Sequence, residues 1–345
     1  MILIIFFLFC VISLIAILED RLGEEVRTPL FFAVGLILAF VAGLRPSDLD
    51  HDYMSYVSLY YRKEAEFTTE ISFVFIANFV YYVLGNVVFV FLIYAFLSLA
   101  LHMKAIRRLT SLWFLSLLMY FCNYYLLHGM NQIRVGVSAG LFLCAIPYLK
   151  KGDRWHYLLL AFCASLFHYT SAILLLLVGF GYSPFKKWQY YFYLSIIPLC
   201  YLLYLSHTNL LMAIPIPYIE EKLTVYQNLQ KMGQWDEINV FNMVFLAKIA
   251  ITYFVFWKHK LIAQYNPYVT VLLKFEILSL AAFIIFYELP VLAFRLSELL
   301  GVVEVILFPL VFYTIKPSII SKVIVVFISL VFLCIGIFFN QVIYV

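Results

Sequence analysis

The decisive stretch begins Met130-Asn131-Gln132-Ile133-Arg134-Val135-Gly136 and continues as apolar residues to Tyr148. A basic stop follows at 150–154, and the next apolar run contains Ala164-Ser165-Leu166-Phe167-His168-Tyr169-Thr170-Ser171. An arginine therefore stands at the start of one membrane-length run, and a histidine lies inside the next. Ionisable groups at such depth in a bilayer are costly, so both residues are functional candidates whose partners have to be found.

Composition places the chain in a broad class. Of its 345 residues, 66% are hydrophobic and 12% are charged, against about 45–50% and about 25% in soluble domains. Apolar runs of membrane length recur from one end to the other, which predicts an all-α, polytopic integral membrane protein forming a single transmembrane domain over 1–345. The sequence has no basic stripe interleaved with aromatic residues, so it indicates no nucleic-acid partner.

Charge placement predicts how the runs are oriented. Basic clusters separate them, and the positive-inside rule places these clusters in the cytoplasm and both termini outside. The longer external loops are then 45–70 and 208–239, and a short helix is expected at 220–231. The basic clusters lie at 104–108, 150–154, 186–187, 258–260 and 316–322. The apolar runs lie near 2–18, 29–44, 71–84, 86–103, 111–127, 133–149, 156–180, 189–206, 240–257, 268–287, 296–313 and 322–339.

Two of these runs do not fit a simple crossing. The run 71–84 is short and amphipathic, which indicates a re-entrant or interfacial helix. The run 156–180 has lysines on both flanks, so two half-helices that meet near Phe167 and His168 would return the chain to the side it left. Irregular backbone at membrane depth is tolerated where it is buried in protein or lines a water-filled cavity. The sequence therefore predicts re-entrant or broken helices within the bundle.

Three arginines stand at or close to predicted external helix mouths: Arg45, Arg134 and Arg295. A guanidinium matches phosphate bidentately and keeps its charge at any working pH, so three on one side suggest an anionic ligand. Asn131 precedes Arg134 by three residues, which would place both on one helical face. Glu298 follows Arg295 by three and could pair with it. The structural alternative is an interface anchor or an architectural ion pair.

Three carboxylates follow Arg45 at alternate positions, Asp48, Asp50 and Asp52. This spacing lacks the glycine and the final glutamate of a calcium loop, so we predict no metal site there. The structural alternative is a solvated loop that provides the N-cap of a helix from Tyr53 onward.

His168 is a lone histidine in an apolar run, and such residues are often satisfied core histidines. Its position at the predicted helix break makes a functional role as well supported as a structural one. Four further charged residues lie within membrane runs, and the simplest expectation for them is a neutralising Lys–Glu pair. They are Lys248, Lys274, Glu276 and Glu304.

Several of these segments occur in an order that resembles a known family. They are Gly43-Leu44-Arg45 with Asp50, Asp52 and Tyr53, then Glu70-x-x-Phe73, Gln132-x-Arg134, the segment 164–171, and Phe294-Arg295. Together they resemble the EpsG-like branch of the Wzy-type polysaccharide polymerases. The segments around Arg134 and His168 are the most specific, whereas 182–286 contains no motif that can be matched.

The resemblance implies a GT-C-like helical bundle in the bacterial inner membrane with its active site on the external face. It implies transfer of a growing glycan from undecaprenyl diphosphate to a lipid-linked repeat unit, without nucleotide sugar, cofactor or obligatory metal. The implied partners are this lipid-linked oligosaccharide, the lipid bilayer and a chain-length-regulating co-polymerase.

The candidate residues fit this chemistry, because a diphosphate leaving group needs fixed cations and an acceptor hydroxyl needs a base. The candidate catalytic residues are His168, Asp50 and Asp52. The candidates for binding diphosphate or sugar are Arg45, Arg134, Arg295, Gln132, Asn131 and Glu298.

Two other function classes compete with this interpretation. A lipid-linked-oligosaccharide flippase or other polysaccharide transporter also predicts broken helices and buried charges, but a transporter should show two related halves, and the sequence shows none. A membrane O-acyltransferase would need a deep histidine in a tunnel that opens to the cytoplasm. Arginines on the external side do not fit such a site.

Overall fold

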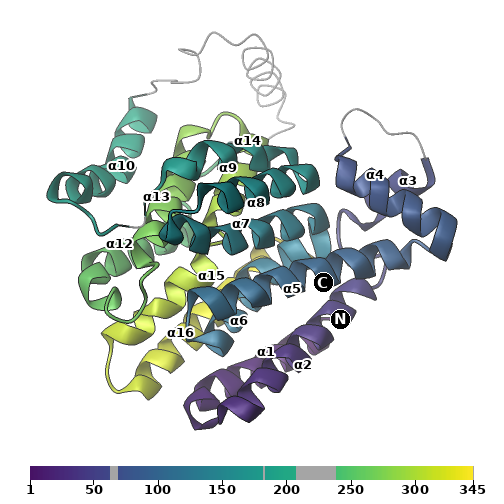
Figure 1. The fold of residues 1–345 in the computed structure, drawn as a ribbon, viewed down its shortest axis with the longest axis horizontal. Helices are drawn as coiled ribbons and strands as arrows, with labels where there is room; N and C mark the ends of the chain where they lie inside the picture. The colour runs from purple at the N-terminus through teal and green to yellow at the C-terminus, as the bar shows by residue number, and fades with distance from the viewer. Residues whose placement is uncertain (63–68, 182, 207–237, 345) are drawn as a thin grey trace.

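The computed structural model describes residues 1–62, 69–181, 183–206 and 238–344. Helices form almost all of this part of the chain (Figure 1), and the β-bridge found in it joins Asp50 to Ile343. Helices satisfy their own backbone hydrogen bonds, which the bilayer interior demands. The predicted all-α, polytopic membrane class is therefore confirmed. Within the described ranges, five helices are long and apolar enough to cross a membrane: Ile2–Arg21, Glu24–Gly43, Val88–Leu109, Ile133–Lys151 and Ser318–Phe339.

The described helices follow the predicted apolar runs with a few informative departures. In chain order they are α1 (Ile2–Leu18), α2 (Glu24–Gly43), α3 (Tyr53–Arg62), α4 (Ile71–Phe79), α5 (Val88–Leu109), α6 (Trp113–Tyr120), α7 (Ile133–Lys151), α8 (Arg154–Phe167), α9 (Ile173–Leu176), α10 (Lys187–Leu205), α12 (Met243–Ile262), α13 (Val269–Ile285), α14 (Pro290–Gly301), α15 (Glu304–Leu307) and α16 (Ser318–Cys334). Wider π-helical turns extend α4 over Val80–Leu84, α6 over Phe121–Asn131 and α16 over Ile335–Phe339.

Helix α7 is the centre of the bundle, packed between α5 and α8. Its membrane window is 78% buried, against 33–56% for the other candidate spans. Small residues allow this enclosure: a Cβ on Gly136 would lie 2.1 Å from the carbonyl oxygen of His128, and one on Gly140 would lie 2.7 Å from Leu101. Small residues let membrane helices approach closely, so the sequence of α7 itself sets its central position.

The basic clusters gather at one end of the bundle. Arg27, at the start of α2, donates to the carbonyl oxygen of Ser111 just beyond α5, and Lys322 lies 2.7 Å from Asp20. The two chain termini lie together at the opposite end (Figure 1), where the ring of Phe6 stacks on that of Phe338. This arrangement is the one that a topology with both termini on the same side requires.

The break predicted inside 156–180 is confirmed. Helix α8 ends at Phe167, and His168 adopts an extended conformation with φ −153° and ψ 118°. A 3₁₀ turn over Tyr169–Ala172 and the short α9 then carry the chain back along α8. The contact between the two arms shows this, since Tyr157 donates to the carbonyl oxygen of Leu174 at 2.9 Å. The hairpin therefore places His168 at its tip.

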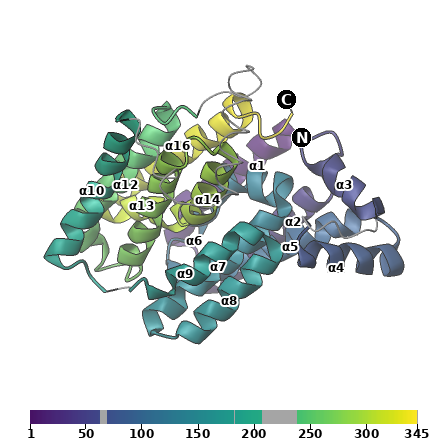
Figure 2. The same cartoon turned by 90° about the horizontal axis from the view of Figure 1, so that it is seen from above.

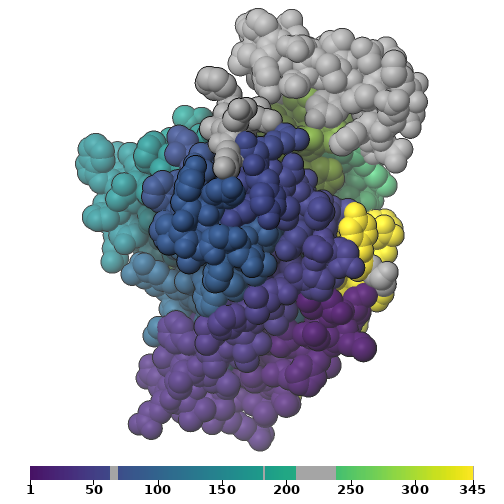
Figure 3. Space-filling model, turned by 90° about the vertical axis from the view of Figure 1, so that its right-hand side faces the viewer, coloured from purple at the N-terminus to yellow at the C-terminus, as the bar shows by residue number. Residues whose placement is uncertain are grey.

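The run 71–84 is short, as predicted. At about 1.5 Å per residue it cannot span a hydrocarbon core of about 30 Å. Gly85, with φ +69°, ends it in the left-handed conformation that glycine adopts without a steric penalty. Helices α3 and α4 form the surface at the end of the molecule that carries the termini (Figure 3). Whether they lie in the membrane interface remains a prediction.

The run predicted at 296–313 is not one helix. Helix α14 begins at Pro290 and ends at Gly301, and α15 begins at Glu304 after a turn at 302–303. Pro290 suits the first position of a helix because its missing N–H needs no partner there. Helix α14 packs along α13 and also touches α7 (Figure 2). The helix predicted at 220–231 lies outside the described residues.

Both ends of the α8–α9 hairpin lie beside the turn that joins α12 to α13. Lys150 lies 4.8 Å from the ring centre of Tyr268, and the ring of Phe185 lies 5.5 Å from that of His259. Reporter domains fused after Gly152 and after Phe185 should therefore both report the cytoplasm. Opposite readings at the two positions would show that 156–180 crosses the membrane once.

Candidate functional site

Glu70 joins two residues that are far from it in the sequence. Arg134 donates a hydrogen bond to one oxygen of the Glu70 carboxylate, and Nδ1 of His168 lies 2.9 Å from the other oxygen. The Glu70 side chain is 5% exposed and that of His168 is 9% exposed. Glu70 directly precedes α4, Arg134 lies in the first turn of α7, and His168 occupies the hairpin tip. Three chain segments thus meet at one buried carboxylate.

The contact with Glu70 fixes how His168 presents its ring. An ionised carboxylate only accepts hydrogen bonds, so Nδ1 carries the hydrogen of this pair. The other nitrogen, Nε2, is buried and has no hydrogen-bond partner in the described part of the chain. In the neutral ring Nε2 carries a lone pair. A carboxylate that orients a histidine whose second nitrogen is free is the arrangement expected of a general base.

Contacts on both sides of the hairpin tip hold this geometry in place. Tyr169 donates to the carbonyl oxygen of Thr69 at 3.0 Å, which connects the residue after His168 to the residue before Glu70. On α7, the hydroxyl of Ser138 donates to the carbonyl oxygen of Ala164 at 3.1 Å. The tip is therefore fixed to both α4 and α7.

Arg134 is only partly enclosed. Its guanidinium lies 5.4 Å from the ring centre of Tyr56 and 5.8 Å from that of Phe73, while 23% of its side chain remains exposed. Burial raises the pKa of Tyr56 to about 12, with the charge of Arg134 opposing this. Tyr56 therefore keeps its hydroxyl proton near neutral pH. A guanidinium has five N–H donors, so the exposed part of Arg134 can bind an anion while Glu70 holds the rest.

Asp52 is the loop carboxylate that lies in the electrostatic field of Arg134. Burial raises the pKa of Asp52, as does the charge of Asp50, and Arg134 opposes both effects. A carboxylate with a raised pKa is a better proton acceptor than an ordinary one. Asp52 therefore stays a candidate base beside His168.

Arg45 and Asp50 form a closed pair instead of an open site. Both side chains are 0% exposed, and the Arg45 guanidinium is covered by the rings of Tyr53 and Phe91. Asp50 also accepts the backbone N–H groups of Asp52 and Tyr53, at 3.0 and 2.8 Å. The structural alternative, an N-cap for α3, is thus present, and this geometry leaves Asp50 no exposed oxygen for chemistry.

Asn131 and Arg134 do not share one helical face, so that interpretation of their spacing is wrong. The wide helical segment ends at Asn131, and Gln132, with φ −89° and ψ 62°, separates it from α7. Asn131 instead donates to the carbonyl oxygen of Val342 at 3.0 Å, in the C-terminal segment. The break turns Gln132 toward α14, where its side chain lies beside Glu298.

Arg295 lies exposed in the middle of α14 and not at a helix mouth, contrary to the prediction. No ion pair joins it to Glu298 in the described structure, although its charge acts on that carboxylate. Helix α14 contacts the 3₁₀ turn that follows His168. Arg295 is therefore carried by an element that borders the candidate site.

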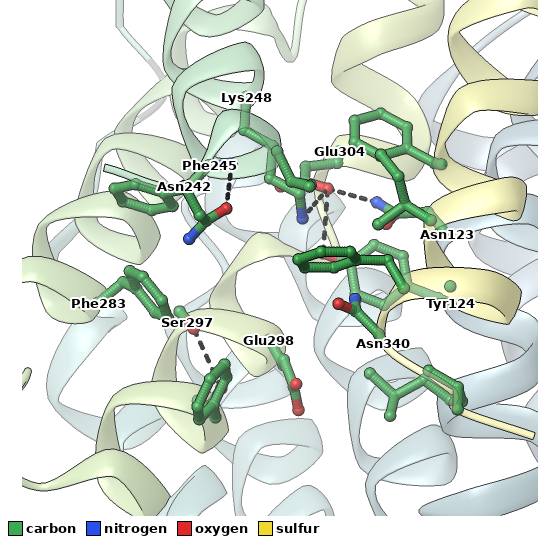
Figure 4. Close-up of a pocket in the computed structure, with 18 of the residues that line it drawn as sticks. Asn123, Tyr124, Asn242, Phe245, Lys248, Phe283, Ser297, Glu298, Glu304 and Asn340 are labelled. Atoms are coloured by element: carbon green, nitrogen blue, oxygen red, sulfur yellow. Dashed lines mark hydrogen bonds and ion pairs between the residues drawn. The ribbon is translucent and has the colours of Figure 1, made fainter. Parts of the chain in front are cut away.

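A cavity of about 500 Å³ lies on the other side of Glu298, between α12, α13, α14 and the wide segment 121–131 (Figure 4). Lys248 lies 2.9 Å from Glu304 there, which confirms the predicted intramembrane Lys–Glu pair. Glu304 also accepts from Asn123 and Tyr124. Lys274 takes a different partner, the carbonyl oxygen of Gly181 at 2.6 Å.

Glu70 and Tyr56 were not among the residues predicted for the site. Glu70 belonged to the motif that carries the family resemblance, but nothing local marked it as the partner of Arg134. The usable signal was its position, since a carboxylate directly before a short apolar helix must find a cation once that helix is packed.

Comparison with known proteins settles the family. A sequence model described as the EpsG family matches residues 29–344. The chain belongs to the EpsG family. This match spans Glu70, Arg134, His168, Arg295 and Glu298, and it confirms the resemblance to EpsG-like polysaccharide polymerases. No curated protein and no solved structure matches this EpsG-family chain, so a GT-C-like architecture remains a prediction.

The pKa of Glu70 predicts an acid-sensitive contribution to stability. Burial alone would raise this pKa, but the hydrogen bond from His168 and the charge of Arg134 hold it below its ordinary value of 4.5. A lowered folded-state pKa gives stability that is present above the unfolded value and lost as pH falls through the folded value. The melting-temperature advantage of wild type over Glu70→Gln in detergent should therefore shrink between pH ~5.5 and ~3, below the ordinary histidine range. A constant difference across that range would contradict the prediction.

Proposed function

We propose that this EpsG-family protein is an oligosaccharide repeat-unit polymerase of the bacterial inner membrane, working at the external face. The growing glycan is transferred from undecaprenyl diphosphate to a lipid-linked repeat unit, and undecaprenyl diphosphate is released. The observation that carries this proposal is the contact of Glu70 with both Arg134 and His168 at a helix break. It joins a base with a free nitrogen to a partly exposed cation in one place.

The proposed reaction is a glycosyl transfer. The acceptor hydroxyl oxygen attacks the anomeric carbon of the donor glycan, and the bond from that carbon to the diphosphate oxygen breaks. Nε2 of His168 takes the hydroxyl proton, and Asp52 is the alternative proton acceptor. Glu70 holds the ring and stabilises the imidazolium that forms, as an orienting carboxylate does in other histidine bases.

The leaving diphosphate needs fixed positive charge, and preorganised cations are an effective way to supply it. Arg134 provides the exposed part of its guanidinium, and Arg295, exposed on α14, provides a second cation. The closed Arg45–Asp50 pair supports a structural role for both, as a clasp that fixes the loop before α3.

The rival functions fit the described geometry less well. A flippase for an anionic lipid needs cations along its path, but Lys248, deep in the bundle, is neutralised by Glu304. A membrane O-acyltransferase needs its histidine near the cytoplasmic side, whereas the hairpin tip with His168 lies at the end opposite the basic clusters. A chain-length-regulating co-polymerase remains a proposed partner.

Deletion of the gene should leave single-repeat lipid-linked product and no polysaccharide ladder on gels of surface glycans. We expect Arg134→Lys and Arg295→Lys to fail to restore the ladder, because a lysine cannot replace a bidentate phosphate contact. The expected loss of rate is about 10²-fold or more. The matched control, Arg21→Lys at the opposite end of the bundle, should restore the ladder. Normal ladders from both site variants at normal protein levels would contradict the diphosphate role, and loss of all repeats on deletion would point to flipping or synthesis.

Removing the proposed base gives a second measurement. His168→Gln should slow polymer formation by ~10²–10⁴-fold, the usual contribution of general acid–base catalysis, without changing the amount of protein in the membrane. The matched control is His156→Gln, which alters an exposed histidine near the basic end of α8 and should leave the rate unchanged. Equal rates for His168→Gln and wild type would remove His168 from the reaction.

A further inference from the structure

The cavity beside Glu298 has mostly apolar walls that carry a small group of polar side chains. At about 500 Å³ it lies within the ~300–1,000 Å³ range of small-ligand pockets. Figure 4 shows Lys248, Glu304 and Tyr124 grouped on one side and Glu298 apart from them. A cavity meant only for a prenyl tail would have an apolar lining, since burying unpaired polar groups is costly.

The charges of the cavity exclude a phosphate. Its only lysine among the lining residues described, Lys248, is already paired with Glu304. Glu298 brings a further carboxylate, and its Oε2 atom is buried without a hydrogen-bond partner in the described structure. Among the lining residues described, no unpaired cation is available to balance an incoming anion beside this carboxylate.

The same lining suits a hydroxyl-rich ring. Carboxylate and amide groups, here Glu298 with Asn123 and Asn340, accept and donate hydrogen bonds to hydroxyls. Aromatic rings supply flat apolar faces for the carbon side of a sugar. The ring centres of Phe245 and Phe283 lie 4.5 Å apart along the same wall. Such a combination of a few polar groups and aromatic walls provides both orientation and contact area.

The cavity is connected to the Glu70 site through Gln132. The Gln132 side chain lies beside Glu298 at the cavity wall, and Arg134 follows two residues later in the first turn of α7. Asn340 and the residues near it place the cavity at the end of the bundle that also carries the site. A glycan seated against Glu298 therefore lies next to the proposed base and the proposed diphosphate cation.

We propose that this cavity is the subsite for the phosphate-free, non-reducing end of the acceptor glycan, with Glu298 as the residue that binds its hydroxyls. This inference rests on the proposed polymerase function and deepens it by separating two subsites. Phosphate binds at Arg134, and the phosphate-free sugar binds in the cavity.

Binding to the purified full-length protein in detergent tests the separation with two probes. One is the oligosaccharide released by mild acid from the host's own lipid-linked repeats and freed of phosphate. The other is farnesyl diphosphate, which carries the diphosphate without a sugar. Equilibrium dialysis gives the Kd of each probe for wild type, Glu298→Gln, Arg134→Lys and the matched control Glu25→Gln, which changes an exposed residue at the start of α2.

We expect Glu298→Gln to weaken oligosaccharide binding about tenfold, because an amide N–H₂ replaces one of the two carboxyl oxygens that bind hydroxyls, and to leave farnesyl diphosphate binding unchanged. Arg134→Lys should weaken farnesyl diphosphate binding and leave oligosaccharide binding unchanged. Glu25→Gln should match wild type for both probes. An unchanged oligosaccharide Kd in Glu298→Gln, or no oligosaccharide binding to wild type, overturns the sugar subsite. If farnesyl diphosphate still binds in an Arg134-dependent way, the proposed function survives that result. If farnesyl diphosphate does not bind to wild type, the proposed function is overturned as well.

Discussion

The arrangement depends on one buried carboxylate. Glu70 is 4% exposed at the end of an apolar bundle, and an isolated charge there would be strongly destabilising. Arg134 pairs with the charge through one oxygen and His168 donates to the other, so loss of Arg134 would leave the charge unpaired and loss of His168 would leave one oxygen without its donor. This requirement holds the start of α4, the start of α7 and the tip of the α8–α9 hairpin together.

The buried charges of the chain are handled in two different ways. Arg45 with Asp50, and Lys248 with Glu304, are closed pairs that neutralise themselves inside the fold. The cluster at Glu70 and the carboxylate of Glu298 are open instead, because Arg134 stays partly exposed beside Glu70 and Glu298 borders the cavity without an ion pair in the described structure. An unpartnered buried atom does not by itself separate the two kinds, since Nη2 of Arg45 has no partner either, like Nε2 of His168 and Oε2 of Glu298. The two open groups lie at the same end of the bundle and are connected through Gln132. That contrast separates residues that hold the fold from residues available to a substrate.

The break in α14 contributes to the same arrangement. Because the chain turns at 302–303, α14 packs against α13 and α7 and presents Arg295 and Glu298 from one short helix. In a continuous helix through this region, the positions of these two side chains would follow the axis of a single helix instead of the separate direction of α14. The departure from the predicted run thus creates one wall of the cavity.

The sequence by itself determined the class, the basic end and the position of the decisive break, because hydropathy, lysine clusters and a histidine between two short apolar runs are local features. It also identified Arg134, His168, Gln132 and Glu298 as residues of interest. Only the tertiary structure decided that Glu70 is the common partner, because its contacts with Arg134 and His168 span 64 and 98 residues. It likewise decided that Arg45 and Asp50 close on each other and that Asn131 lies apart from Arg134. Pairing of buried charges is a property of packing, and no local pattern specifies which of several carboxylates a given cation will meet.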